Sequence, residues 1–229
     1  MELKDKVVVI TGASKGLGRE LAQTFTKEGA KVVISARSEK ELQEVAEELG
    51  ALAIAADVTK ENDVESLARD VVREYGRIDI WINNAGAWIP HGPIEELDMK
   101  RVHDMMEVNL FGTMYGSRVA LIQMRKQNGG MIINILSTSA LEGRSGSSGY
   151  CASKYAAVGF TKSLRKETKD SGITVISIYP GGMQTNLFDE EKPEDIDKYM
   201  QPSFVVERIV QNLQQREPKE ELIIRRPSK

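Results

Sequence analysis

Short apolar runs alternate along the whole chain with longer segments in which apolar residues recur at helical spacing. The runs are continuous and rich in Val and Ile, which is typical of strands buried on both faces of a parallel sheet. Such sheets are covered by helices on each side. The pattern predicts strands near residues 6–11, 31–36, 51–56, 78–82, 131–136, 173–179 and 221–224, and helices near residues 17–28, 39–49, 61–75, 98–126, 149–170 and 203–215.

The second predicted helix carries signals at both of its ends. Ser38-Glu39-Lys40-Glu41 has the order of a capping box, in which the Ser and the second Glu satisfy free backbone N–H groups at a helix start. Gly50 stands where a left-handed residue would end the helix. Right-handed crossovers between such strands and helices would build a doubly wound α/β sheet of about seven strands.

Length and composition agree with one large α/β domain. The chain has 229 residues, of which 41% are hydrophobic, so it can bury a full core. No linker, internal repeat or low-complexity stretch divides it. We therefore expect a single domain over residues 1–229.

A glycine-rich turn follows the first predicted strand. Thr11-Gly12-Ala13-Ser14-Lys15-Gly16-Leu17-Gly18 joins that strand to the first predicted helix, so the free N–H groups of the helix start would face an anion such as a pyrophosphate. Glycine permits positive φ and a close approach of backbone to ligand. The spacing differs from both Gly-x-Gly-x-x-Gly and the P-loop, so the turn alone is only moderately specific.

Tyr150 and Lys154 stand four residues apart in a predicted helix, about one turn, which places both side chains on one face. A neighbouring ammonium favours the ionised phenol. We therefore expect the Tyr150 pKa to fall from about 10 towards neutrality, where a proton donor or acceptor is most useful.

Charge and targeting signals exclude several classes of partner. The 31 basic and 34 acidic residues give a net charge of −3, without the basic block that nucleic acid or an anionic membrane would require. The acidic run Asp189-Glu190-Glu191 is interpreted as a solvated loop. No apolar run approaches the about 20 residues that span a bilayer, and the N-terminus lacks a signal-peptide pattern. A soluble cytoplasmic protein is expected.

The few cysteine and histidine residues suggest neither a disulfide nor a metal site. Cys151 is the single cysteine, and we interpret it as a packed thiol. His91 and His103 are separated by twelve residues, which is not a ligand spacing. A serine hydrolase is not indicated either, because no Gly-x-Ser-x-Gly is present.

The glycine turn and Tyr-x-x-x-Lys together resemble the short-chain dehydrogenase/reductase family. Further stretches match that family in the same order, namely Asp57-Val58, Asn83-Asn84-Ala85-Gly86, Asn109, Ser137 and Pro180-Gly181-Gly182-Met183-Gln184-Thr185. The match covers about Lys6 to Thr185. Because these motifs follow strand ends, the resemblance implies a Rossmann-type sheet with one crevice at the carboxyl ends of its strands.

The resemblance also implies the residues of the site. The catalytic set would be Asn109, Ser137, Tyr150 and Lys154. The nicotinamide dinucleotide would be held by Gly12, Ser14, Lys15, Gly16, Leu17, Gly18, Arg37, Asp57, Val58, Asn84, Ala85, Gly86, Tyr150, Lys154, Pro180, Gly181, Met183 and Thr185.

The second predicted strand ends in Arg37, where an NAD-binding chain would place an acid for the ribose 2′-hydroxyl. An Arg offers a fork of donors for a 2′-phosphate, and Lys15 supplies a second cation. We therefore predict NADP(H) over NAD(H).

The implied reaction is the reduction of a carbonyl compound. Tyr150 would give its proton to the carbonyl oxygen, Ser137 would orient and polarise the carbonyl, Lys154 would hold the nicotinamide ribose, and Asn109 would hold a water that resupplies the proton. The predicted function is an NADPH-dependent reductase of ketones, aldehydes or 3-oxoacyl compounds. The alternatives are an alcohol or sugar dehydrogenase working oxidatively, and a non-catalytic NADP-binding regulator.

Two parts of the chain depart from the family pattern. Leu136 stands where many relatives carry a serine, which changes packing only. The segment 185–202 is short and acidic, and it is expected to contact the small-molecule substrate. Candidates to line an apolar pocket are Trp88, Ile89, Leu141, Met183, Leu187 and Phe188. The resemblance also implies a homo-oligomer, dimer or tetramer, formed through the helices near 98–126 and 149–170.

Overall fold

Seven parallel strands form one sheet in the computed structural model, which describes residues 2–226. Their order is β3-β2-β1-β4-β5-β6-β7, so the winding direction reverses between β1 and β4. The strands are β1 Val7–Thr11, β2 Lys31–Ser35, β3 Leu52–Ala53, β4 Ile80–Asn83, β5 Gly130–Ile135, β6 Ile173–Pro180 and β7 Glu221–Ile224. The predicted doubly wound fold is confirmed; Met1 and residues 227–229 lie outside the described part.

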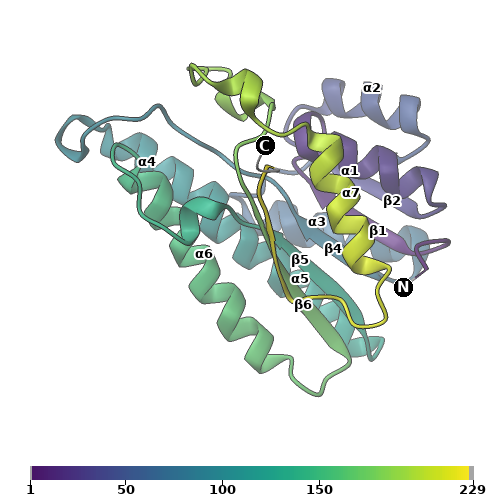
Figure 1. Cartoon of the computed structure of the whole chain (residues 1–229). Coiled ribbons are helices and arrows are strands. Elements are labelled where there is room, and N and C mark those ends of the chain that lie inside the picture. The colour runs from purple at the N-terminus through teal and green to yellow at the C-terminus, as the bar shows by residue number, and fades with distance from the viewer. Residues whose placement is uncertain (1, 227–229) are drawn as a thin grey trace.

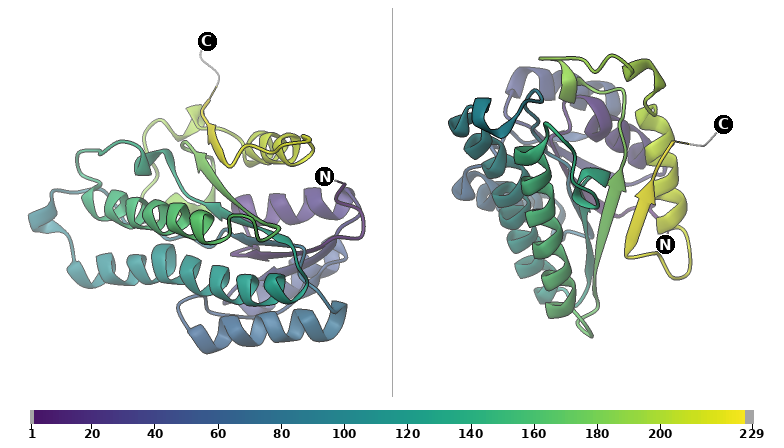
Figure 2. Two further views of the ribbon diagram at one scale, coloured as in Figure 1. Left: turned by 90° about the horizontal axis from the view of Figure 1, so that it is seen from below. Right: turned by 60° about the vertical axis from the view of Figure 1, so that its left-hand side comes forward.

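Helices cover both faces of the sheet (Figures 1 and 2). They are α1 Gly16–Lys27, α2 Glu39–Leu49, α3 Glu61–Tyr75, α4 Met99–Met106, α5 Gly112–Lys126, α6 Ser148–Glu167 and α7 Pro202–Leu213. Side chains of α1, α2 and α7 share one hydrophobic cluster with the sheet, and those of α3, α5 and α6 share the other. The sheet is therefore the middle of three layers.

The pleat of β1 supplies both clusters. Val8 and Ile10 belong to the cluster under α1, whereas Val7 and Val9 belong to the cluster under α3 and α5. Successive side chains of a strand point to opposite faces, so a strand that is apolar throughout can be buried on both sides. The continuous apolar runs of the sequence are explained in this way.

The third strand is shorter than the sequence predicts. A strand was expected over 51–56, but β3 spans only Leu52–Ala53 at the edge of the sheet. The backbone still follows β2 beyond that point, because Ile54 N donates to Ile34 O at 3.0 Å. An edge strand has one neighbour, so its regular ladder ends early while the chain stays extended.

The ends of α2 agree with the prediction in position but not in the capping bond. Ser38 is the N-cap residue of Glu39–Leu49, yet its side chain makes no capping hydrogen bond, so that part of the capping-box prediction is wrong. Gly50 has φ 66° and donates its N–H to Ala46 O. The helix therefore ends as predicted, with glycine in the left-handed region.

The helix expected over 98–126 is continuous but changes geometry in its middle. A π-helical segment, Glu107–Phe111, joins α4 to α5. Such segments insert a residue into the helical repeat and are frequent at functional sites. Asn109 lies in this segment, and its side chain is turned into the protein, where it is 1% exposed.

A chain of buried side-chain hydrogen bonds ties the centre of the sheet to α5 and α6. Trp81 Nε1 donates to Asn83 Oδ1 at 2.8 Å, and Asn83 Nδ2 donates to Ser117 Oγ at 3.0 Å and to Asn134 Oδ1 at 2.8 Å. Asn134 Nδ2 donates in turn to Thr161 Oγ1 at 2.9 Å. Buried polar groups need such partners, so the network fixes how both helices sit on the sheet.

Gly116→Ala is expected to lower the free energy of unfolding by about 2 to 4 kcal/mol, through overpacking and a broken buried hydrogen bond. A Cβ there would lie 2.0 Å from Asn83 Oδ1 and 2.7 Å from Trp81 Nε1. Urea unfolding measures the change, with Gly143→Ala as the control because a Cβ at Gly143 meets nothing within 4 Å. Equal midpoints for the two variants would contradict the tight packing of α5 on β4.

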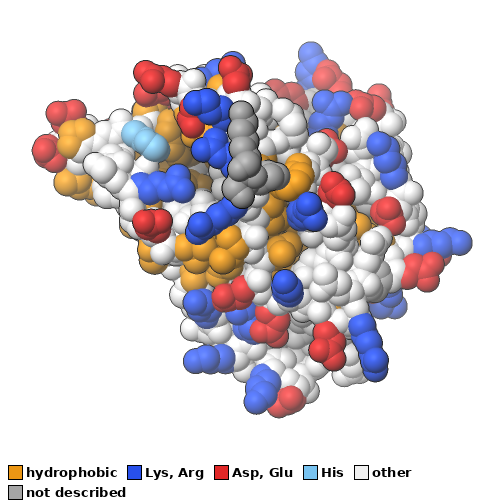
Figure 3. Space-filling view, viewed as in Figure 1, with side chains coloured by type: hydrophobic (Ala, Val, Ile, Leu, Met, Phe, Trp, Pro, Cys, Tyr) orange, Lys and Arg blue, Asp and Glu red, His pale blue; other side chains and the backbone are white. Residues whose placement is uncertain are grey.

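The surface carries charges of both signs, which are interspersed over most of the face in Figure 3. Hydrophobic side chains gather in the middle of that face, in the region that β7 occupies in Figure 1. Ile223 of this edge strand is 51% exposed. Within residues 2–226, each helix is too short or too polar to cross a membrane.

Candidate active site

One cleft, with a volume of about 1090 Å³, runs along the carboxyl ends of the strands. It passes the point between β1 and β4 where the strand order reverses, which is where doubly wound sheets bind their ligands. All residues predicted to hold a dinucleotide line it, namely Gly12, Ser14, Lys15, Gly16, Leu17, Gly18, Arg37, Asp57, Val58, Asn84, Ala85, Gly86, Tyr150, Lys154, Pro180, Gly181, Met183 and Thr185.

The glycine turn after β1 has no room for side chains. Gly12 has φ +64°, and a Cβ at this position would lie 2.7 Å from Ala85 Cα. A Cβ at Gly18 would lie 2.3 Å from the carbonyl oxygen of Gly12. The N-cap of α1, Lys15, makes no capping hydrogen bond with its side chain. This cradle fits a pyrophosphate at a helix N-terminus.

Asn84 fastens the glycine turn to the end of β4. Its Nδ2 donates to Thr11 O at 2.8 Å and to Gly12 O at 3.0 Å. Its backbone N–H donates to Thr11 Oγ1 at 3.1 Å. The side chain of Asn84 is thus bonded to the backbone of Thr11 and Gly12, so it holds the glycine turn against the segment that follows β4.

Asp57 presents one carboxylate oxygen to the cleft. Its Oδ1 accepts from Thr59 N at 3.0 Å and from Thr59 Oγ1 at 2.8 Å, and its backbone N–H donates to Asp63 Oδ2. Oδ2 of Asp57 accepts no hydrogen bond from the residues that the structure describes. It can therefore accept one from an amino group such as that of adenine.

Two cations lie near the ends of β1 and β2. Arg37 is exposed at the cleft and forms no ion pair within residues 2–226. Lys15 Nζ is 4.0 Å from Asp189 Oδ2, with both side chains more than half exposed. An exposed pair at this distance is weak and screened by salt, so Lys15 can exchange that partner for another anion.

The hydroxyls of Ser137 and Tyr150 lie close enough to influence each other, because the Ser137 hydroxyl lowers the pKa of Tyr150. Ser137 follows β5 and is 8% exposed, and its Oγ accepts from Ser139 N at 3.1 Å, which begins the short 3-10 helix Thr138–Ala140. Tyr150 lies in the first turn of α6. Two elements thirteen residues apart in sequence thus bring two hydroxyls to one point of the cleft.

Lys154 lies one turn further along α6 and is 5% exposed. Its Nζ donates to Ile135 O at 3.3 Å and lies 6.0 Å from the ring centroid of Tyr150. A Cβ at Gly86 would be 3.8 Å from the same nitrogen. The ammonium therefore sits between the end of β5 and the segment after β4, near the ring of Tyr150.

The pKa values of this pair contradict the expectation from the sequence. Burial raises the pKa of Tyr150 to about 12, although the hydroxyl of Ser137 acts in the opposite direction. Burial also lowers the pKa of Lys154 to about 8. The lysine therefore loses its charge before the phenol would ionise, so it does not stabilise a phenolate. At neutral pH the phenol keeps its proton, which is the form that a proton donor needs.

Asn109 lies beside the cleft and does not line it. Its Oδ1 accepts from Ala87 N at 2.8 Å, and its Nδ2 donates to Ala87 O at 2.9 Å and to Ser153 Oγ at 3.0 Å. The amide is therefore engaged with the segment after β4 and with α6. Asn109 Oδ1 and Lys154 Nζ both lie close to Gly86, at 3.6 and 3.8 Å from the position that a Cβ would take there.

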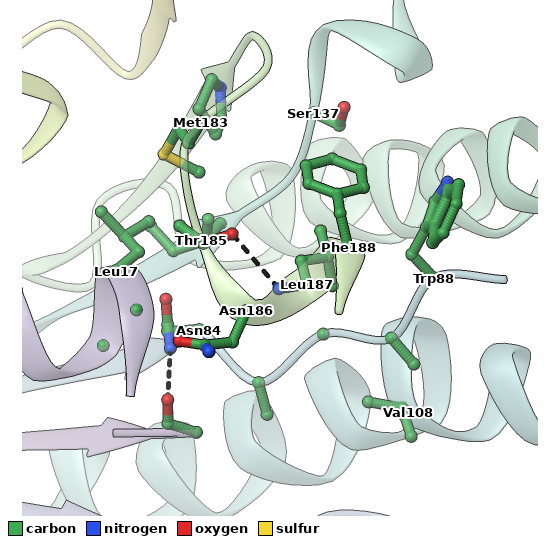
Figure 4. Close-up of a pocket in the computed structure, with 18 of the residues that line it drawn as sticks. Leu17, Asn84, Trp88, Val108, Ser137, Met183, Thr185, Asn186, Leu187 and Phe188 are labelled. Atoms are coloured by element: carbon green, nitrogen blue, oxygen red, sulfur yellow. Dashed lines mark hydrogen bonds between the residues drawn. The ribbon is translucent and has the colours of Figure 1, made fainter. Parts of the chain in front are cut away.

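Aromatic rings form one wall of the cleft at the end away from the glycine turn. Trp88 and Phe188 are in edge contact, with ring centroids 5.2 Å apart, and Phe188 meets Tyr199 at 5.9 Å. Figure 4 shows Phe188 between Ser137 and Trp88, and Thr185 Oγ1 accepting from Leu187 N at 3.4 Å. Of the predicted pocket residues, Trp88, Met183, Leu187 and Phe188 line the cleft, whereas Ile89 and Leu141 do not.

Several further lining residues were missed from the sequence, among them the polar residues His91, Ser139, Arg144 and Ser147. They belong to no motif and lie in loops or at helix starts. Ser147 Oγ and His91 Nε2 are hydrogen-bonded at 2.6 Å, across fifty-six residues of sequence. The only sequence signal for Arg144 is that it is a cation six residues before Tyr150.

Comparisons with known proteins agree with this geometry. The family model of the short chain dehydrogenases matches residues 6–196. An uncharacterized oxidoreductase of Staphylococcus aureus is 35% identical over 216 residues, which cover 93% of each chain. Its function is thus named only as an oxidoreductase.

Two solved structures share the fold. A 3-ketoacyl-(acyl-carrier-protein) reductase from Brucella melitensis, complexed with NADH, has a TM-score of 0.90 and 28% identity, covering 97% of both chains. A short-chain dehydrogenase from Streptomyces avermitilis has a TM-score of 0.87 and 29% identity, covering 99% of this chain and 90% of that one. Sequence, site and fold therefore agree that the chain belongs to the short-chain dehydrogenase/reductase family of oxidoreductases.

Proposed function

We propose that the chain is an NADPH-dependent carbonyl reductase that acts on a ketone, an aldehyde or a 3-oxoacyl compound. The observation that carries this proposal is that Ser137 and Tyr150 line the same cleft as the glycine turn, with the Ser137 hydroxyl close enough to lower the pKa of the phenol. Lys154 Nζ lies over the ring of Tyr150, 6.0 Å from its centroid. The Brucella structure is that of a 3-ketoacyl reductase, which supports the reductive direction by likeness.

Each catalytic side chain has a distinct task. A reduced nicotinamide, when bound, supplies the hydride that adds to the carbonyl carbon. Tyr150 donates its phenolic proton to the carbonyl oxygen, and Ser137 donates a hydrogen bond that orients this oxygen. Lys154 would hold the hydroxyls of the nicotinamide ribose. Asn109 holds the backbone of Ala87 through two hydrogen bonds. The family resemblance implies that it also holds a water that resupplies the proton to Tyr150.

Burial holds Tyr150 in the protonated form, which is the form that the reductive step uses. An alcohol or sugar dehydrogenase needs a phenolate to accept the proton of the alcohol, but burial raises the pKa of Tyr150 to about 12. A protonated phenol is ready to donate at neutral pH. A non-catalytic regulator would not require Ser137 and Tyr150 to meet in the cleft, so this alternative is disfavoured as well.

NADPH is expected to give a kcat/KM about 10- to 100-fold higher than NADH, because Arg37 and Lys15 offer charge-assisted hydrogen bonds to a 2′-phosphate. Arg37→Asp should abolish this preference, since an acid repels the phosphate. Arg73→Asp is the control, because Arg73 lies on α3 with its side chain 79% exposed. Equal kcat/KM values for the two cofactors in the natural chain would overturn the assignment.

The remaining predictions concern the rest of the molecule. We propose a single domain over residues 1–229, with the substrate contacted by residues 185–202. This segment is tied to the end of β6, because Gln184 N donates to Met200 O at 2.9 Å.

A homo-oligomer through α5 and α6 is supported by the exposure of Phe111, Ile122 and Tyr155. A cytoplasmic location stays a prediction.

The proposed activity is tested with a panel of ketones, aldehydes and 3-oxoacyl thioesters, followed by the loss of NADPH absorbance. We expect steady oxidation of NADPH with at least one class. Reduction of NADP⁺ by alcohols or sugars, without any carbonyl reduction, would instead establish the oxidative alternative. Binding of NADPH without turnover of any substrate would favour the regulator.

A further inference from the structure

A single arginine stands at the substrate end of the cleft. Arg144 lies between the 3-10 helix Thr138–Ala140 and α6, and it lines the cleft together with Ser147 and Tyr150. Within residues 2–226 its guanidinium makes one hydrogen bond, from Nη2 to Thr138 Oγ1, which is long at 3.3 Å. Among residues 2–226, no carboxylate lies within ion-pair distance of its guanidinium. Four of its five N–H donors are thus available to a ligand.

The loop that carries Arg144 is held on both sides. Ser147 N donates to Arg144 O at 3.1 Å, and Gly92 N donates to Gly146 O at 2.9 Å. Ser147 Oγ is also hydrogen-bonded to His91 Nε2. The backbone of the loop is therefore anchored to the segment after β4, which forms the opposite wall of the cleft.

The charge of Arg144 reaches the reacting phenol. It lowers the pKa of Tyr150 and also that of Tyr199, on the aromatic wall, although burial raises both overall. The guanidinium is thus within electrostatic range of the proton donor on one side and of the aromatic wall on the other. Besides Arg144 and the catalytic Lys154, the cleft is lined by two basic residues. These are Lys15 and Arg37, and both lie at the end proposed to bind the nucleotide.

Two acids also line the substrate end, Glu191 and Asp195. Asp195 lies close enough to Tyr199 to raise the pKa of its hydroxyl. Glu191 is exposed and forms no ion pair within the described part of the chain. Their charge disfavours a dianion such as a phosphate more strongly than it disfavours a monoanion. A planar carboxylate also matches the donor fork of an arginine.

We propose that Arg144 binds a carboxylate of the substrate, so that the preferred substrates are oxo acids rather than neutral ketones. The inference rests on the proposed reductase function and specifies the substrate class of the same site. In such a complex the carbonyl oxygen faces Ser137 and Tyr150, the carboxylate pairs with Arg144, and the part between them packs against Phe188 and Trp88. Arg144 would then determine specificity without taking part in proton transfer.

The kinetic test compares oxo acids of increasing chain length with their methyl esters, using NADPH. The natural chain should prefer the acid at one or more lengths by about 10- to 100-fold in kcat/KM, as expected for a charged hydrogen bond. Arg144→Gln should remove this preference through KM and leave the ester within about twofold. Arg144→Lys should keep part of it. Arg69→Gln on α3 is the control, because Arg69 is 67% exposed and outside the cleft.

A binding measurement makes the inference independent of turnover. The NADP⁺-loaded protein is titrated with the saturated acid that lacks the carbonyl, with its methyl ester and with the matching phosphate, and Trp88 fluorescence reports occupancy. The acid should bind at least about tenfold more tightly than the ester and the phosphate, and Arg144→Gln should abolish the difference. Equal affinities of acid and ester would overturn the inference, and tighter phosphate binding would overturn the choice of carboxylate.

The two proposals fail in different ways. Reduction of esters and acids at equal rates in the natural chain and in Arg144→Gln would overturn the role of Arg144 while leaving the reductase function intact. Absence of turnover for every carbonyl compound, together with selective binding of the acid, would overturn the reductase function and keep the carboxylate site.

Discussion

Tyr150→Phe is expected to lower kcat by about 10²- to 10⁴-fold, which is the usual contribution of a positioned proton donor. The variant keeps the ring but deletes the hydroxyl that lies near Ser137 in the cleft. The glycine turn and Asp57 are unchanged, so the affinity for NADPH should stay close to that of the natural chain. Stopped-flow reduction of a substrate from the panel measures the first quantity, and fluorescence titration with NADPH measures the second.

Tyr155→Phe is the matched control for this experiment. Tyr155 lies on the same helix but its side chain is 44% exposed and does not line the cleft. It should therefore keep the turnover of the natural chain. Near-normal turnover in Tyr150→Phe would show that the proton comes from another group, and equal losses in both variants would point to damage of α6 rather than to chemistry.

Lys154→Met is expected to lower activity by at least about 10²-fold and at the same time to raise the stability of the unliganded protein. Burial holds the pKa of Lys154 at about 8, compared with 10.5 in the unfolded chain. At pH 7 the native protein must carry a buried ammonium, which costs at most about 3 kcal/mol. Methionine fills similar space without a charge. The lost hydrogen bond to Ile135 O reduces the gain, so we expect about 1 to 3 kcal/mol.

The pH dependence of this gain has a definite sign. Between pH 8 and pH 10.5 the unfolded chain binds a proton at Lys154 that the native protein does not, so the stability of the natural chain rises with pH in that window. The advantage of Lys154→Met should therefore be largest at pH 7 and shrink towards pH 10. Urea unfolding at both pH values measures it.

Lys162→Met serves as the control, because Lys162 is on the same helix with its side chain 55% exposed. Its effect on stability should be small at both pH values. A Lys154→Met variant that is less stable than the natural chain at pH 7 would contradict the buried-charge account. A constant difference between pH 7 and pH 10 would contradict the lowered pKa.

The expected gain in stability of Lys154→Met implies that the natural site lowers the stability of the unliganded protein. An ammonium in an apolar environment is unfavourable without a partner, and Ile135 O is its only hydrogen-bond acceptor within residues 2–226. The hydroxyls of a bound ribose would add the acceptors that the unliganded protein lacks. Cofactor binding is therefore expected to raise the melting temperature of the natural chain more than that of Lys154→Met.

Local pattern was sufficient for the arrangement of the main elements. The continuous apolar runs identified strands buried on both faces, and the bounds of α2, α3 and β7 agree with the expected 39–49, 61–75 and 221–224. In a parallel sheet all strand ends of one polarity meet at one edge, so motifs that follow strands had to converge. The gathering of Gly12, Asp57 and Ser137 in one cleft follows from that rule.

Other features depend on contacts that no local pattern contains. The side-chain conformation of Ser38, which makes no capping bond to α2, is not set by the local sequence. The π segment places Asn109 where its side chain hydrogen-bonds to Ala87 and Ser153. Tyr199 and Arg144 reach the cleft from loops whose path is set by long-range hydrogen bonds. Neither residue stands in a recognisable motif.

The sequence by itself determined the doubly wound sheet, the family and the set of side chains that meet at its edge, because these follow from periodicity and from strand polarity. Only the tertiary structure decided the protonation of that set. Spacing alone placed an ammonium beside a phenol and suggested a lowered pKa for Tyr150, whereas burial of the phenol raises its pKa to about 12. Desolvation depends on everything that surrounds a group, and no short stretch of sequence contains that information.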